Sequence, residues 1–139
     1  MHAYPYRFVY LMNSPPVSLL GLPLKRVVWV GSSRRDLREL PDAVQDRVDY
    51  ALYMAQRGGK HQDAKPLKRY GGAGVVEVVT DYRGDTFRAV YTVRFADAVY
   101  VLHVFQKKSK SGRATPQRDV KLIERRLREA ERIAKETGR

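Results

Sequence analysis

The fold is decided by residues 99–116, which read VYVLHVFQKKSKSGRATP. The first seven residues are apolar except for one histidine and are rich in β-branched and aromatic side chains, which is typical of a buried strand. At the other end, Thr115 and Pro116 suit the N-cap and first position of a helix. The loop between them carries four cations and no acid: Lys107, Lys108, Lys110 and Arg113. Because regular elements hold both of its ends, we expect this basic loop to present binding groups.

The charge of the chain indicates what such a loop would bind. The 139 residues include 27 lysines and arginines against 15 acids, a net charge of +12. A surplus of this size favours a polyanionic partner, and we expect the basic loop to face RNA phosphate. There is no cysteine, and the three histidines are scattered, so we expect neither a metal site nor a cofactor. No apolar run is long enough to span a membrane, and we expect a cytoplasmic protein with no membrane partner.

The first 24 residues differ in character from the rest. They are aromatic and short of charge, and the sequence NSPP at residues 13–16 interrupts them. We expect residues 1–24 to form a loosely ordered arm that packs on the domain or on a partner, and residues 25–139 to form one domain.

Helices and strands are indicated along most of that domain. Residues 25–30 predict a strand, and residues 33–40 and 41–57 predict a helical hairpin that ends at two glycines. Residues 60–74 predict an irregular, cationic connection. Residues 75–80, 86–95 and 99–105 predict an antiparallel meander, and residues 116–137 predict a final amphipathic helix. The order β-α-α-β-β-β-α defines an α+β domain with a small twisted, mainly antiparallel sheet.

Two positions in these strands bear on function. Alternation along residues 86–95 places Phe87 and Tyr91 on one face of the sheet and Arg88 on the other. His103 is expected to share a face with its strand neighbours Val99, Val101 and Phe105, as a half-buried histidine with a polar partner rather than a catalytic group.

A set of short motifs runs through this domain in order. They are KPLK at residues 65–68, RAVY at 88–91, FQKK at 105–108 and TP at 115–116. The set resembles the RelE/ParE toxin superfamily and, within it, the HigB-type, phage Gp49-like branch, over residues 25–133. The resemblance implies a RelE-like fold, a toxin of a type II toxin–antitoxin system that cleaves mRNA on the ribosome, and a small antitoxin partner, often a helix-turn-helix protein.

The resemblance also implies which residues act. The family's functional positions match Arg88, Lys68, Lys107 and Lys108 as catalytic residues. Further cations are expected to bind RNA: Lys65, Arg69, Lys110 and Arg113. Residues 110–114 make the basic loop longer than in many members. Several relatives carry a histidine or tyrosine base near the chain end, which this final helix lacks, so the general base stays open.

These residue types suit metal-free RNA cleavage, in which the ribose 2′-OH attacks its own phosphate. Arg88 can bind phosphate with a fork and stabilise developing charge. Clustered lysines lower one another's pKa, so Lys68 or Lys107 can serve as base or acid. Glu77 is a weaker candidate for the base, and Arg88 can instead pair with Glu77 or Asp85. Two other functions stay open: a ParE-like gyrase poison, and a non-enzymatic nucleic-acid-binding phage accessory protein.

Overall fold

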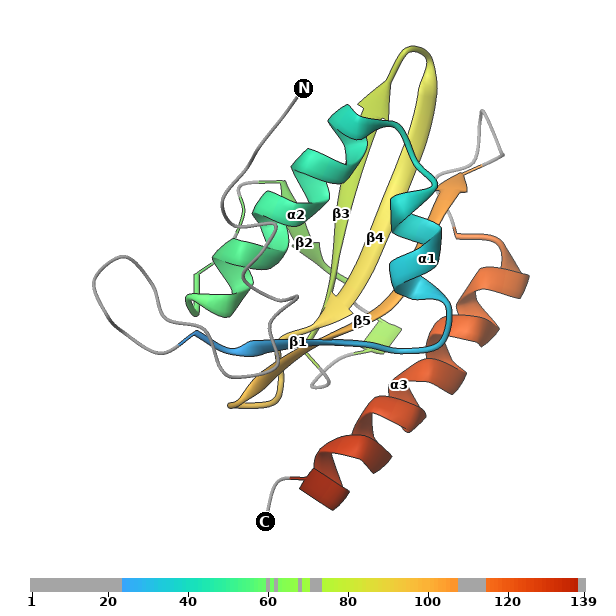
Figure 1. Ribbon diagram of the computed structural model, residues 1–139. Helices are drawn as coiled ribbons and strands as arrows, with labels where there is room; N and C mark the ends of the chain where they lie inside the picture. The colour runs from blue at the N-terminus through green and yellow to red at the C-terminus, as the bar shows by residue number, and fades with distance from the viewer. Residues whose placement is uncertain are drawn as a thin grey trace.

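The computed structural model describes residues 24–59, 61, 63–67, 69–70, 74–107 and 115–137. Its elements follow one another as β1 (Arg26–Trp29), α1 (Ser33–Arg38), α2 (Asp42–Gln56), β2 (Ala64–Pro66), β3 (Val75–Tyr82), β4 (Asp85–Thr92), β5 (Ala98–Lys107) and α3 (Gln117–Thr137) (Figure 1). This order confirms the predicted one with a single addition. The addition is β2, a three-residue edge strand inside the connection predicted for residues 60–74. So short a segment, with a proline in it, has no alternation to reveal it.

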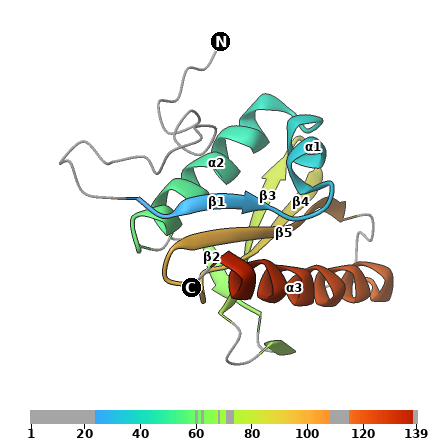
Figure 2. The ribbon, with the colours of Figure 1, turned by 60° about the horizontal axis from the view of Figure 1, so that its bottom comes forward.

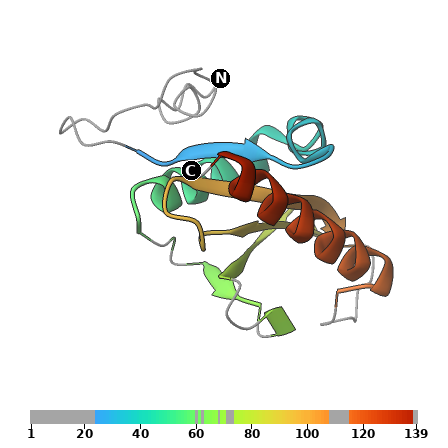
Figure 3. The same cartoon turned by 90° about the horizontal axis from the view of Figure 1, so that it is seen from below.

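The five strands form one sheet in the order β1-β5-β4-β3-β2. β1 pairs with β5 in parallel, and every other pair of neighbours is antiparallel. Helices α1 and α2 lie over one face of this sheet and α3 lies over the other, as the two turned views show (Figure 2, Figure 3). The predicted α+β class, with a mainly antiparallel sheet, a helical hairpin and a C-terminal helix, is therefore confirmed.

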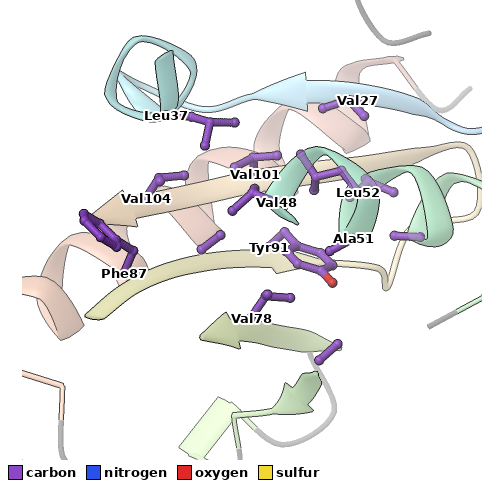
Figure 4. Packing of buried hydrophobic residues seen from close by; sticks show 14 of the residues in the cluster. Val27, Leu37, Val48, Ala51, Leu52, Val78, Phe87, Tyr91, Val101 and Val104 are labelled. Carbon is purple, nitrogen blue, oxygen red and sulfur yellow. The ribbon is translucent and has the colours of Figure 1, made fainter. Parts of the chain in front are cut away.

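The larger core lies between α2 and the sheet (Figure 4). Val48 and Leu52 are almost fully buried there, against Val78, Tyr91 and Val101 of the three central strands. The apolar stripe predicted for α2 is confirmed, since all five of its members are buried: Val44, Val48, Ala51, Leu52 and Ala55. This core fixes the strands that carry the candidate site on their opposite face.

The second core lies under α3. Ile123, Leu127 and Ala130 of the helix share a cluster with Val90 and Leu102 of the sheet. These helix positions follow the predicted 3.6-residue spacing, so the apolar stripe of α3 is also confirmed. Among the described residues, no helix combines the length and apolarity needed to cross a membrane. The arm predicted for residues 1–24 lies outside the described part of the chain except for Leu24, and the domain division stays a prediction.

One prediction about β5 is wrong, and a β-bulge explains why. Val90 of β4 pairs with His103, but Tyr91, the next residue, pairs with Val101, so Leu102 is an extra residue on β5. Val99 and Val101 consequently belong to the core under α2, whereas Leu102 lies in the core under α3. His103 and Phe105 lie on the α3 face and do not share a face with Val99 and Val101. The extra residue breaks the period of two on which the prediction relied.

Candidate nucleic-acid interface

The α3 face of the sheet gathers three of the cations that the sequence singled out: Lys65, Arg88 and Lys107. Lys65 pairs with Glu77, Glu77 with Val90 and Val90 with His103, which forms one row across four strands. Directly opposite residues of paired strands share a face, and Val90 belongs to the core under α3. Arg88, two residues from Val90, lies in the next row opposite Phe105, and Lys107 lies one row further, opposite Thr86.

Arg88 is held in place from two sides. Its Nη1 donates a hydrogen bond to Glu77 Oε2 at 2.9 Å and to Thr115 Oγ1 at 3.3 Å. The Arg88 and Glu77 side chains are only 10% and 13% exposed. The ion pair with Glu77 that the sequence left open is therefore present. A buried guanidinium fixed by a carboxylate and a hydroxyl has little rotational freedom, so Arg88 is an oriented charge.

Lys107 lies at the exposed border of the same arrangement. Partial burial lowers the pKa of its amine, and the nearby Arg88 charge lowers the pKa further, while Glu77 acts in the opposite direction. The sequence predicted that neighbouring cations would lower the pKa of a lysine here, and the direction of the shift agrees. A lysine with a lowered pKa gives up its proton more readily than an ordinary surface lysine.

The connection before β3 contributes the other described cations. Lys65 and Arg69 are both exposed. Leu67 and Tyr70 pack on the core under α3, and the Tyr70 hydroxyl donates to the Val120 carbonyl at 3.4 Å. This segment therefore lies against the N-terminal half of α3, which begins two residues after Thr115. The other predicted site residues fall outside the described part of the chain: Lys68, Lys108, Lys110 and Arg113.

A buried histidine–aspartate pair lies beside Arg88. His103 Nε2 and Asp119 Oδ1 are 2.8 Å apart, and the two side chains are 8% and 9% exposed. Burial lowers the pKa of His103, although the hydrogen bond and charge of Asp119 raise it. His103 also stacks on Phe105, with ring centroids 4.4 Å apart and an interplanar angle of 15°. The prediction that His103 is buried with a polar partner is confirmed. The bulge explains why the side chain lies on the α3 face, toward Asp119.

Sequence reasoning missed two residues that complete this arrangement. Thr115 was predicted only to cap a helix, and Asp119 was not singled out at all. Both contact strand residues distant in the chain, Arg88 and His103, which no local pattern reveals. Within the described part of the chain, no group of histidines and acids could hold a metal ion.

Comparison with protein-family models matches residues 35–128 to a family described as Phage derived protein Gp49-like (DUF891). The match spans more than half of the chain, and the chain therefore belongs to this family, a family of RelE-like toxins. The predicted membership of the RelE/ParE superfamily is thereby confirmed, while the HigB-type assignment stays a prediction. Among solved structures, the toxin–antitoxin complex RelBE2 from Mycobacterium tuberculosis contains a chain that is similar, with 27% identity and a TM-score of 0.41. That match covers 62% of this chain and 100% of the other. A search of curated proteins found no match.

Proposed function

We propose that this RelE-like toxin is an mRNA endonuclease that cleaves on the ribosome without a metal, using the ribose 2′-OH as nucleophile. The observation that carries the proposal is the oriented Arg88, fixed by Glu77 and Thr115 on the face from which Lys65 and Lys107 also emerge. Phosphoryl chemistry of this kind needs preorganised positive charge at the phosphate and a proton donor for the leaving oxygen.

Each residue then has a distinct role. Arg88 stabilises the charge that develops on the phosphorane, because a guanidinium stays protonated and binds two phosphate oxygens. Lys107, with its lowered pKa, donates a proton to the leaving 5′-oxygen. Lys68 is our candidate for the base, with Lys108 as a second cation at the phosphate. The remaining cations follow the RNA backbone: Lys65, Arg69, Lys110 and Arg113.

The same face is also our candidate for the antitoxin contact. A chain with a net charge of +12 attracts acidic protein segments as well as RNA. An antitoxin of the helix-turn-helix kind with an acidic segment would cover Lys65, Arg88 and Lys107 and exclude RNA.

Induced expression in bacteria, with growth and mRNA 5′ ends followed together, tests the proposal. Wild type should arrest growth and cut within translated codons, and Arg88→Ala should lower cleavage about 10²–10³-fold, the loss typical of one oriented donor. Arg94→Ala is the matched control, because Arg94 is also an arginine in an ion pair, with Glu131 at 2.8 Å, but on the exposed surface.

Two further variants separate chemistry from folding. Arg88→Lys keeps a cation beside Glu77 but loses the fork, and the double variant Arg88→Ala/Glu77→Ala removes the unpaired buried carboxylate. Growth arrest with DNA damage and no new mRNA ends would favour a gyrase poison instead. Salt-sensitive RNA binding without cleavage or arrest would favour a non-enzymatic binding protein.

A further inference from the structure

The His103–Asp119 pair joins the sheet to the first turn of α3 beside the candidate site. Asp119 is the third residue of α3, and its backbone N–H bonds to the Pro116 carbonyl at 3.0 Å. Its side chain accepts from His103 on β5. Thr115, four residues before Asp119, contacts Arg88. The pair therefore fixes the segment from which Thr115 reaches the guanidinium.

The β-bulge gives the pair its place. Without the bulge, strict alternation from Val101 through Leu102 would place His103 on the α2 face, away from α3. With it, Leu102 fills the core under α3 and His103 faces Asp119. A bulge disrupts the ladder locally, and bulges are common next to functional sites, where they re-aim a side chain.

The histidine itself is poorly placed to take a proton from RNA. The residue is only 7% exposed. With Nε2 facing a carboxylate, a neutral imidazole carries its proton on Nε2, and Nδ1 has no hydrogen-bond partner among the described residues. One ring face stacks on Phe105, the residue directly opposite Arg88. The His103 ring thus contacts Phe105, the residue opposite Arg88, with one face, and it contacts α3 through its hydrogen bond to Asp119.

We propose that His103 and Asp119 are positioning residues for Arg88: their hydrogen bond holds the start of α3 so that Thr115, together with Glu77, orients the guanidinium toward phosphate. Packing alone does not require such a pair, since apolar side chains of similar size commonly stabilise a core as well as buried polar pairs do. The catalytic consequence rests on the proposed nuclease function. The geometric consequence, the orientation of Arg88, does not.

The matched control is a second set of hydrogen bonds that joins α3 to the rest of the domain, here called the Arg126 clamp. Arg126, about two turns further along α3, donates from Nη1 to the Leu102 carbonyl at 2.9 Å and from Nη2 to Ser32 Oγ at 3.0 Å. Arg126→Met loosens α3 from β5 at the neighbouring residue of the same strand, but it leaves the Thr115–Arg88 contact in place. If the His103–Asp119 pair served stability alone, its loss and the loss of the Arg126 clamp should change the cleavage rate to the same extent.

The test compares His103→Leu, Asp119→Ala and Arg126→Met with the conservative variant His103→Gln, whose side-chain amide can replace the Nε2–H donor. Cleavage rate, RNA affinity and the NMR signal of the Arg88 guanidinium are measured at a temperature at which every variant is folded. We expect His103→Leu and Asp119→Ala to lower the cleavage rate about 10–100-fold, with RNA affinity changed much less, and to shift the Arg88 signal. His103→Gln should restore most of the rate, and Arg126→Met should stay within about twofold of wild type.

Two results would overturn the proposal. One is an Arg88 signal that does not change in His103→Leu and Asp119→Ala. The other is a loss of activity in Arg126→Met as large as in those two variants. If wild type cleaves no RNA, the nuclease function fails, and the Arg88 signal still decides whether the pair positions the guanidinium.

Discussion

Arg88 of β4 reaches diagonally across the sheet to Glu77 of β3, with 2.9 Å between Nη1 and Oε2. The two are not opposite one another, because Glu77 pairs with Val90 and Arg88 pairs with Val79. The contact therefore directs the guanidinium along the sheet toward Thr115, rather than straight out from it. A carboxylate so close to a proposed phosphate site can either orient Arg88 or act as a base, and substitution distinguishes the two.

We expect Glu77→Gln to keep cleavage within about tenfold of wild type, because the amide oxygen still accepts the Arg88 hydrogen bond. RNA affinity should increase, since one negative charge leaves the phosphate site. Rate and affinity can be measured separately on ribosome-bound mRNA. A fall in rate of about 10²–10⁴-fold with unchanged affinity would instead make Glu77 the general base and contradict our assignment.

Lys107→Arg tests proton transfer at the border of the site. Arginine keeps the charge and binds phosphate, but its pKa is too high for it to donate a proton readily. We expect RNA affinity to be retained and the cleavage rate to fall about 10²-fold or more. Lys121→Arg, at an exposed position on α3, is the control and should behave as wild type. Full activity in Lys107→Arg would reduce the role of Lys107 to charge alone.

Gly31→Ala tests the Arg126 clamp through its backbone neighbour. Gly31 has φ +58°, and a Cβ there would lie 2.6 Å from Arg126 Nε. We expect a loss of about 2–4 kcal/mol in the free energy of unfolding, from left-handed strain and from displacement of the guanidinium. Gly84→Ala is the control, because φ is +85° but no atom lies within 4 Å of its Cβ. Urea unfolding measures the free energy of unfolding of both variants. Equal losses would show that the Arg126 side chain moves aside without destabilising the protein.

Acidification should destabilise the protein through two buried histidines. Burial lowers the pKa of His61 and of His103 from 6.5. The unfolded chain therefore binds more protons than the folded one below about pH 6.5, so stability is fully present above that pH and is lost as pH falls toward the folded pKa values.

Urea unfolding between about pH 8 and pH 5 measures this dependence, which is at most about 1.4 kcal/mol per pH unit for each histidine. The variant His61→Gln/His103→Gln should show a smaller loss over the same range, because it lacks both imidazoles. An unchanged slope in the variant would show that these histidines do not cause the loss.

The sequence predicted those elements whose apolar residues follow a regular period. The apolar stripes of α2 and α3 were enough to identify the buried side of each helix, and alternation placed Arg88 on the face opposite Phe87 and Tyr91. The alternation of period two fails in β5, where Leu102 is an extra residue. β2 has only three residues, too few to show any alternation. The site was predictable to the same degree. Arg88 and Lys107 came from a motif, whereas Thr115 and Asp119 depend on contacts between α3 and the sheet.

The chemistry of the new mRNA ends tests the central claim most directly. Attack by the ribose 2′-OH on phosphorus expels the 5′-oxygen and leaves a 5′-hydroxyl on one fragment and a 2′,3′-cyclic phosphate on the other. Attack by water that expels the 3′-oxygen instead leaves a 5′-phosphate and a 3′-hydroxyl. Ligation that captures only 5′-hydroxyl ends, applied to cells expressing wild type, Arg88→Ala or Arg94→Ala, separates these cases. We predict 5′-hydroxyl ends within codons for wild type and Arg94→Ala, and their loss in Arg88→Ala. New ends that carry 5′-phosphate, or growth arrest without new ends, would contradict this account.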